Sequence, residues 1–174
     1  MVEKGDVMKL DLGCGKKKRE GFIGVDSIQF EGVDQVCDLT KPWPWEDSSV
    51  DEVFCSHLVE HLTWPERIHF FNELGRVLKP KGTATIMTPH WSHACFYGDP
   101  DHKAPLSEWY VFYLNKNWRS TEAPHSLYTC DFDWTFAGSW DGWLESKNAE
   151  FKQFAMNRYV NSWRDLIVTL TKRE

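Results

Sequence analysis

The sequence predicts an α/β domain built on an open sheet of mostly parallel strands. Short apolar runs recur along the first ninety residues, an amphipathic helical segment separates the fourth run from the fifth, and glycine-containing turns follow the first. At 174 residues the chain has the length of one domain, and no repeat or linker-like stretch divides it. We therefore treat residues 1–174 as a single domain.

Each expected strand is a short apolar run rich in β-branched residues. The first five cover residues 8–12, 22–25, 34–38, 50–55 and 82–88. Between the last two, Trp64 to Leu78 carries apolar residues at helical spacing, and Pro65 lies where a first turn tolerates proline. Further along, we expect a strand over 128–136, a helix over 147–163 and a final strand over 166–171 that closes one edge of the sheet.

The connection between the first two strands is too short for a full helix. Only eight residues separate Gly13 from Phe22, whereas a parallel crossover usually needs a dozen or more. We expect a loop with at most one helical turn, so a ligand held there would lack most of the positive end of a helix. The basic run Lys16 to Arg19 lies in this loop, either as a solvated turn or as positive charge for a ligand.

Composition indicates a cytoplasmic protein. The formal net charge of −6 argues against an extensive nucleic-acid surface. The five cysteines form no CxxC pair, which fits reduced thiols better than disulfides. No apolar stretch reaches the ~18 residues of a membrane span, and Met1 to Asp6 has no signal-peptide character.

Two strand ends carry residues typical of a nucleoside site. The first run ends in Asp11-Leu12-Gly13-Cys14-Gly15, and the second ends in Gly24-Val25-Asp26. Glycine lets the main chain approach a bound group closely, and an acid at a strand end can accept hydrogen bonds from ribose. Both features predict a nucleoside-bearing cofactor at the carboxyl ends of parallel strands.

With further blocks, the chain resembles the class I S-adenosylmethionine-dependent methyltransferases, in particular a small type 11-like subgroup with a shortened first crossover. The additional blocks are Val36–Leu39, Asp47–His57, Val59–His61 and Asn72–Gly82, in the family's order and spacing. The resemblance covers about residues 8–90. It implies a Rossmann-like three-layer sandwich with an antiparallel last strand, and S-adenosyl-L-methionine as the cofactor.

The resemblance also implies which residues bind the cofactor. They are Asp11, Gly13, Cys14, Gly15, Asp26, Asp38, Leu39, Cys55 and Ser56. The glycine turn and the end of the fourth strand would contact the methionine part, Asp26 the two ribose hydroxyls, and Asp38 with the Leu39 backbone the adenine edge. For Cys14 and Cys55, packing as small buried residues is an equal alternative.

The implied reaction is methyl transfer to an N or O nucleophile of a small molecule. A sulfonium methyl is already activated, so the protein mainly aligns the nucleophile and excludes water. A base is needed where the nucleophile loses a proton. The candidates are His57, His90 and His102, which follow the fourth and fifth strands, although each could instead be a packing residue.

Substrate recognition is expected in the long segment 89–125, which is rich in aromatic and titratable residues and suits an active-site lid. Within it, Trp109, Phe112 and Tyr113 are expected to form the core face of a helix over 107–117. After the fourth strand there is no Pro-Pro-aromatic tetrapeptide, and no Pro-Cys nucleophile occurs. DNA is therefore disfavoured as a partner, RNA stays open, and a small-molecule substrate is preferred.

Two alternatives remain. The protein could be a non-catalytic S-adenosylmethionine-binding module or a partner subunit, because its cofactor site lacks cover from an N-terminal helix. His57-x-x-Glu60-His61 also matches the inverted zinc-peptidase pattern and would indicate a zinc hydrolase. The motif's position after an apolar strand opposes that interpretation, so no metal is expected.

Overall fold

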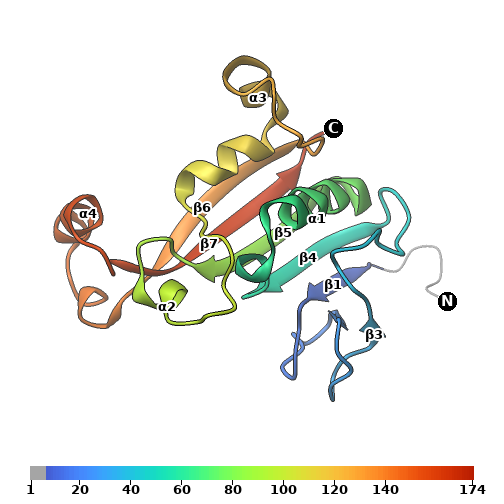
Figure 1. Cartoon of the computed structure of the whole chain (residues 1–174), viewed down its shortest axis with the longest axis horizontal. Coiled ribbons are helices and arrows are strands. Elements are labelled where there is room, and N and C mark those ends of the chain that lie inside the picture. Colours follow the sequence, from blue (N-terminus) through green and yellow to red (C-terminus); the bar gives the residue numbers. More distant parts are fainter. Residues whose placement is uncertain (1–6) are drawn as a thin grey trace.

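A seven-stranded sheet runs through the structure in the order β3-β2-β1-β4-β5-β7-β6 (Figure 1). The computed structural model describes residues 7–174, so the expectation about Met1 to Asp6 lies outside them. The strands are β1 (Lys9–Leu12), β2 (Ile23–Asp26), β3 (Gln35–Val36), β4 (Val50–Ser56), β5 (Leu78–Pro89), β6 (Phe132–Trp140) and β7 (Trp163–Lys172).

Strand direction decides where a site can form. The pairs β1–β2, β1–β4, β2–β3 and β4–β5 are parallel, whereas β7 is antiparallel to both β5 and β6. Pro89 at the end of β5 pairs with Asp165 near the start of β7. The carboxyl ends of the parallel strands and the amino end of β7 therefore meet at one edge, which confirms the predicted fold class.

The helical segments are short except for one. They are η1 (Val59–His61), α1 (Trp64–Val77), α2 (Ala94–Tyr97), η2 (Glu108–Leu114), α3 (Lys116–Glu122), η3 (Gly142–Leu144) and α4 (Ala149–Arg158). At the start of α1 the Thr63 N–H donates to the Glu66 carboxylate at 2.7 Å, within a capping box. None of the helices in residues 7–174 has the length and hydropathy of a membrane crossing.

Between β1 and β2 the chain forms a loop without a helix, as predicted. Side-chain carboxylates hold this loop in place of helical hydrogen bonds. Asp11 accepts the Arg19 N–H at 2.6 Å. Asp34 accepts the Gly24 N–H at 2.7 Å and binds the Lys18 ammonium at 2.8 Å. The loop is therefore fixed to both flanking segments.

The two faces of the sheet are covered differently. In β5, Ala84 and Ile86 are buried on the face that α1 covers, whereas Thr83 and Thr85 on the other face are half-buried. No helix connects β1, β2 and β3. Of the three expected layers, the layer on this second face is reduced to loops, and one of them places the Arg19 guanidinium 4.5 Å from the Phe54 ring centroid.

The expected helix over 107–117 is wrong in type and orientation. The chain forms the 3₁₀-helix η2 followed by α3, and Trp109 is 72% exposed rather than a core residue. A 3₁₀-helix repeats every three residues, so Val111 and Leu114 share the buried face. The late elements are also displaced, since β6 begins at Phe132 and β7 at Trp163.

Candidate active site

The glycine turn after β1 combines close packing with open space. Gly13 has a φ of 72° and Gly15 a φ of 52°, a region that costs other residues about 1–2 kcal/mol. A Cβ at Gly13 would lie 3.1 Å from the Leu58 Cβ, whereas nothing lies within 4 Å of a Cβ built at Gly15. Gly13 thus allows the turn to pack on Leu58, and Gly15 leaves room for a ligand.

Asp26 is fixed beside this turn. One carboxylate oxygen accepts the Gly15 N–H at 2.9 Å and the other accepts the Ile28 N–H at 3.0 Å. The side chain is half-buried at the end of β2. Each carboxylate oxygen has a further lone pair, so the pre-oriented group can accept two hydroxyl donors.

The end of β3 presents polar groups of a second kind. Asp38 accepts hydrogen bonds from the Thr40 hydroxyl and N–H at 2.6 and 3.0 Å, which hold the pKa of its carboxyl below the ordinary value. The Leu39 carbonyl accepts the Trp43 indole N–H at 3.1 Å. Within residues 7–174 the Leu39 N–H has no hydrogen-bond acceptor. Asp38 and Leu39 therefore fit recognition of a base edge.

Four further residues were predicted to bind the cofactor; three of them are buried in the core and one is half-buried. Cys55 is entirely buried, and burial raises the pKa of its thiol well above the ordinary value. Cys14 is 9% exposed and Asp11 only 3%, and burial raises the pKa of both. Ser56 is half-buried at the strand end. The Cys55 side chain therefore packs in the core, between its strand partners Leu12 and Ile86.

His57 begins a row of titratable groups across the sheet edge. Its Nδ1 lies 3.2 Å from Glu60 Oε1 and its Nε2 lies 3.9 Å from Asp165 Oδ1. The hydrogen bond with Glu60 raises the pKa of His57. Glu60 is entirely buried and also accepts the Thr88 hydroxyl at 3.1 Å.

The inverted zinc-peptidase interpretation is wrong for these residues. That pattern needs both histidines on one helical face, but η1 contains only Val59–His61, and His57 lies before it with a φ of 54°. The His57 ring contacts Glu60, whereas the His61 Nδ1 lies 3.3 Å from the Asp101 carbonyl oxygen. The two imidazoles therefore have different surroundings.

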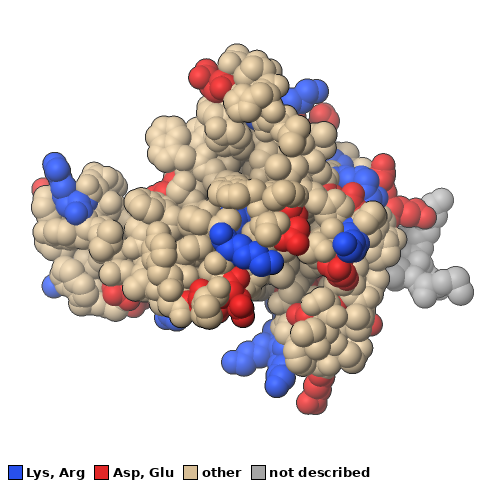
Figure 2. Space-filling view, viewed as in Figure 1, with Lys and Arg blue, Asp and Glu red and all other residues tan. Residues whose placement is uncertain are grey.

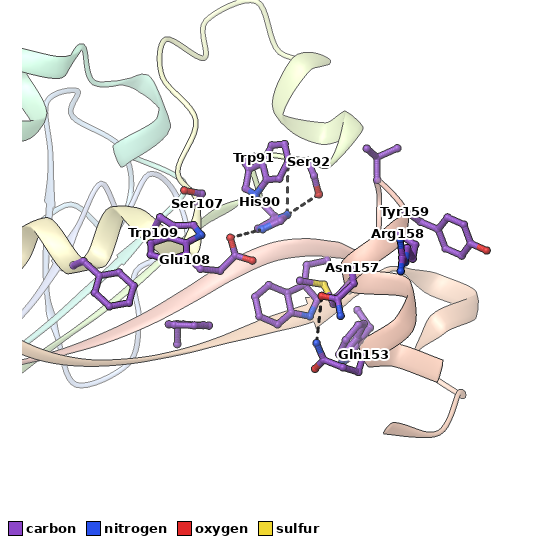
Figure 3. Close-up of a pocket in the computed structure, with 16 residues that line it drawn as sticks. His90, Trp91, Ser92, Ser107, Glu108, Trp109, Gln153, Asn157, Arg158 and Tyr159 are labelled. Atoms are coloured by element: carbon purple, nitrogen blue, oxygen red, sulfur yellow. Dashed lines mark hydrogen bonds and ion pairs between the residues drawn. The ribbon is translucent and has the colours of Figure 1, made fainter. Parts of the chain in front are cut away.

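A cavity of about 900 Å³ lies where β5 ends and β7 begins (Figure 3). One wall comes from the segment predicted as a lid, and the other from α4 and the adjoining ends of β6 and β7. Seven of its sixteen lining residues are aromatic: Trp91, Trp109, Phe112, Phe136, Trp140, Tyr159 and Trp163. Such a lining suits an apolar, planar ligand.

Polar side chains also line the cavity, and one group of them centres on His90. Its Nδ1 lies 2.8 Å from the Ser92 hydroxyl, and its Nε2 lies 3.3 Å from a Glu108 carboxylate oxygen (Figure 3). This interaction lowers the pKa of Glu108. His90 Nε2 and Trp163 Nε1 are both buried without an aligned hydrogen-bond partner in residues 7–174. The cavity wall thus places an imidazole beside a carboxylate and a buried indole N–H near them.

The third predicted histidine lies elsewhere. His102 Nδ1 is 2.7 Å from the Phe96 carbonyl oxygen, and its ring packs on Phe96. It lines neither this cavity nor the second one of about 560 Å³ between α1 and η2. The structure brings His57 and His90 to the ends of adjacent strands, whereas His102 lies outside the cavity that His90 lines.

Charge is dispersed over the surface of the molecule seen in Figure 2. On that face Lys and Arg form small separate groups between wide uncharged areas. This distribution agrees with the net charge of −6. It gives no continuous basic stripe of the kind that a nucleic-acid backbone needs.

Several residues of the edge were missed from the sequence. They are Glu108, Trp140, Trp163 and Asp165. Asp165 directly precedes the last apolar run, where an acid at a strand end is the same signal that identified Asp26. Gly138 marks the place where Trp163 packs on β6, because a Cβ at Gly138 would lie 2.0 Å from the Trp163 ring. In the sequence, the sign of this close approach is the glycine itself.

The strand order and the polar groups at this edge define an α/β protein with the class I methyltransferase fold. Residues 15–86 match the family model described as a methyltransferase domain. The resemblance seen in the sequence is thereby confirmed for this segment and for the fold.

Solved structures share this fold over nearly the whole chain. A SAM-dependent methyltransferase from Archaeoglobus fulgidus is 22% identical, with a TM-score of 0.70, covering 97% of this chain and 87% of that chain. A chain from the complex between the Haloferax volcanii Trm112 methyltransferase activator and the putative methyltransferase matches at 17% identity and a TM-score of 0.57, covering 99% of this chain and 84% of that chain.

Geranyl diphosphate C-methyltransferase from Streptomyces coelicolor A3(2), solved with Mg²⁺, geranyl diphosphate and S-adenosyl-L-homocysteine, matches at 13% identity and a TM-score of 0.58. The match covers 96% of this chain and 72% of that chain. No curated protein matches the sequence significantly. At such low identities these likenesses establish the fold, and function has to be argued from the site.

Proposed function

We propose that the protein is an S-adenosylmethionine-dependent methyltransferase that acts on a small, apolar, aromatic acceptor through an N or O nucleophile. The observation that carries the proposal is the aromatic cavity at the end of β5, on the sheet edge where the glycine turn and Asp26 also lie. In α/β sheets, ligands bind at the carboxyl ends of strands. Five free cysteines agree with a reducing, cytoplasmic compartment.

The residues that would hold the cofactor are those at the ends of β1, β2, β3 and β4. Asp26 would accept the ribose hydroxyls, the glycine turn would admit the methionine part, and Asp38 with the Leu39 N–H would bind the adenine. When bound, the cofactor supplies an activated methyl group that leaves its sulfonium for the nucleophile, while the bonding electrons return to sulfur.

The protein's own contribution is then to orient the acceptor and accept its proton. Trp91, Trp109 and Trp163 would hold a planar acceptor by stacking, which also excludes water from the reacting atoms. The His90–Glu108 pair is the group in the cavity wall that can receive the proton released from an N–H or O–H nucleophile. His102 lies outside the cavity and is not assigned this role.

The test separates cofactor binding from transfer. S-adenosylmethionine and S-adenosylhomocysteine should each raise the melting temperature, whereas NAD should not. Release of S-adenosylhomocysteine is then measured with phenols, aromatic amines and matched aliphatic compounds, in the wild type and in His90→Gln. Turnover of aromatic acceptors that falls at least tenfold in His90→Gln supports the proposal. No melting shift at millimolar cofactor contradicts it.

A non-catalytic binding module is the second candidate. The cofactor residues line neither of the two cavities described above, and no helix joins β1 to β2 behind the glycine turn in residues 7–174. One structural neighbour, in addition, was solved in complex with an activator protein. For this alternative we expect cofactor binding without transfer to any acceptor, and turnover only after a partner chain is added.

A further inference from the structure

A cluster of possible metal ligands lies outside the aromatic cavity. Glu60 and His61 belong to η1, and His102 follows α2 some forty residues later. One possible ligand atom from each lies within 4.8 Å of those of the other two. The backbone holds the two segments together, because the Lys103 N–H donates to the Glu60 carbonyl oxygen at 2.8 Å.

Hydrogen bonds fix the tautomers of both imidazoles. His61 Nδ1 lies 3.3 Å from the Asp101 carbonyl oxygen, and His102 Nδ1 lies 2.7 Å from the Phe96 carbonyl oxygen. A carbonyl oxygen only accepts, so each Nδ1 carries a hydrogen, and in the neutral ring the lone pair lies on Nε2. Metal-binding histidines typically donate their other ring N–H to a backbone carbonyl in this way.

The third member is a buried carboxylate. Glu60 has no exposed surface and accepts hydrogen bonds from Thr88 and His57. A buried carboxylate is costly without positive charge nearby. The equally buried Arg67 directs its guanidinium to the carbonyl oxygens of Val59 and Ala104, and no ion pair joins it to Glu60 among the described residues. His57 Nδ1, 3.2 Å from Glu60 Oε1, is the basic group paired with this carboxylate, and a bound cation would add further positive charge beside it.

We propose that Glu60, His61 and His102 bind a divalent transition-metal ion, with zinc as the first candidate, which fastens the 99–104 segment to η1. Two imidazole nitrogens and one carboxylate select such an ion over Mg²⁺ or Ca²⁺, which prefer oxygen ligands. Ligands of tetrahedral zinc lie about 3.4 Å apart, so ligand atoms that lie within 4.8 Å must approach by up to about 1.4 Å. Asp99, whose Oδ2 lies 3.7 Å from His102 Nε2, can supply a fourth ligand.

This site differs from the excluded zinc-peptidase pattern. That pattern required His57 and His61 as the pair of ligands, whereas here His102 replaces His57. The metal would lie between η1 and the segment after α2, outside the cavity proposed for the acceptor. Its role would therefore be to position the lid, and its presence can be tested without any assay of methyl transfer.

The first experiment measures metal content. Tag-free protein is produced in zinc-supplemented medium, dialysed and analysed by mass spectrometry of the elements. We expect about one zinc per chain in the wild type and below about 0.1 in His61→Ala and His102→Ala. The matched control His125→Ala removes an exposed histidine from the other cavity and should retain the zinc.

The second experiment identifies the ligands directly. Protein stripped with EDTA is titrated with Co²⁺, which should give a visible d–d absorption band in the wild type and in His125→Ala but not in His102→Ala. Zn²⁺ should raise the melting temperature of the stripped wild type. Circular dichroism checks that each variant is folded. If a variant is not folded, the Co²⁺ and Zn²⁺ titrations of the wild type still test whether the protein binds a metal ion.

Two results would overturn the proposal. One is folded wild-type protein that carries no metal and gives no band with Co²⁺. The other is metal retained in both histidine variants, which would place it elsewhere in the chain. Because neither readout involves the cofactor or an acceptor, a failed methyltransferase assay would leave the metal result unaffected.

Discussion

The two ends of the ligand-binding edge hold their groups by different physical means. At β1, β2 and β3, backbone N–H groups and carboxylates are fixed by loops, and the residues are small or acidic. At β5, β6 and β7, the cavity is lined by large rings around the His90–Glu108 pair. Under the proposed function, the first end would recognise hydrogen-bonding groups, and the second would recognise shape and apolar surface. Substitutions should separate these two functions.

Asp26→Ala should have the largest effect, and on the cofactor end only. Hydrogen bonds to a charged group contribute about 1.5–3 kcal/mol, so we expect S-adenosylhomocysteine affinity to fall about 10- to 150-fold. Isothermal titration calorimetry measures it. Glu31→Ala, which removes an exposed acid from the same region, is the control. A dissociation constant within twofold of the wild type would mean that Asp26 does not bind the ribose.

Gly138→Ala tests the opposite end. The new Cβ would lie 2.0 Å from the Trp163 ring, so the ring must move. Overpacking of this kind costs about 1–3 kcal/mol, and urea unfolding should show that loss. We expect the acceptor KM to rise while the cofactor Kd is unchanged. Gly142→Ala is the matched control, because nothing lies within 4 Å of its Cβ.

Trp109→Ala asks whether an exposed ring of the cavity contributes to binding. Trp109 is 72% exposed, so its removal should change the free energy of unfolding by less than about 0.5 kcal/mol. Loss of one stacking contact should raise the acceptor KM by about two- to tenfold. Trp143→Ala removes a tryptophan that is 57% exposed and lines neither cavity. Equal effects of both variants on KM would contradict a specific role for Trp109.

Lys18→Met should have the smallest effect, and one that depends on pH. The hydrogen bond from Lys18 lowers the pKa of Asp34 in the folded protein. The Lys18–Asp34 pair therefore stabilises the fold above about pH 4, and this stabilisation is lost as the pH falls through the lowered pKa of Asp34. Because the pair is exposed, we expect at most about 0.5 kcal/mol at pH 6. Urea unfolding should show a smaller difference from wild type at pH 3 than at pH 6. Lys17→Met should show none.

The sequence predicted the half of the fold that local patterns determine. The strands β1, β2 and β4 and the helix α1 begin and end within one or two residues of their expected bounds, because turn residues and a capping box mark them. The missing first helix followed from the spacing of Gly13 and Phe22. Trp109 was placed in the core because a helical period was assumed, whereas the chain adopts the shorter 3₁₀ period there.

The residues of the candidate site also differ in whether local sequence patterns could predict them. Asp26 and His57 lie at strand ends that their own sequence neighbourhood identifies. Trp140 and Trp163 could not be placed, because they come together through the antiparallel register of β6 and β7, which depends on pairing between distant segments. Glu60 and His102 likewise meet only through a long-range backbone contact of the 99–104 segment.

The loop between β1 and β2 has a consequence for the ionic conditions under which the protein works. A helix behind the glycine turn would present a fixed, partly buried positive end to an anionic ligand. Here the loop offers only exposed basic side chains such as Lys16 and Lys17, whose attraction to a carboxylate is screened over about 10 Å at 0.1 M salt. Cofactor affinity should therefore decline as salt rises, and occupancy would follow the ionic strength of the surroundings.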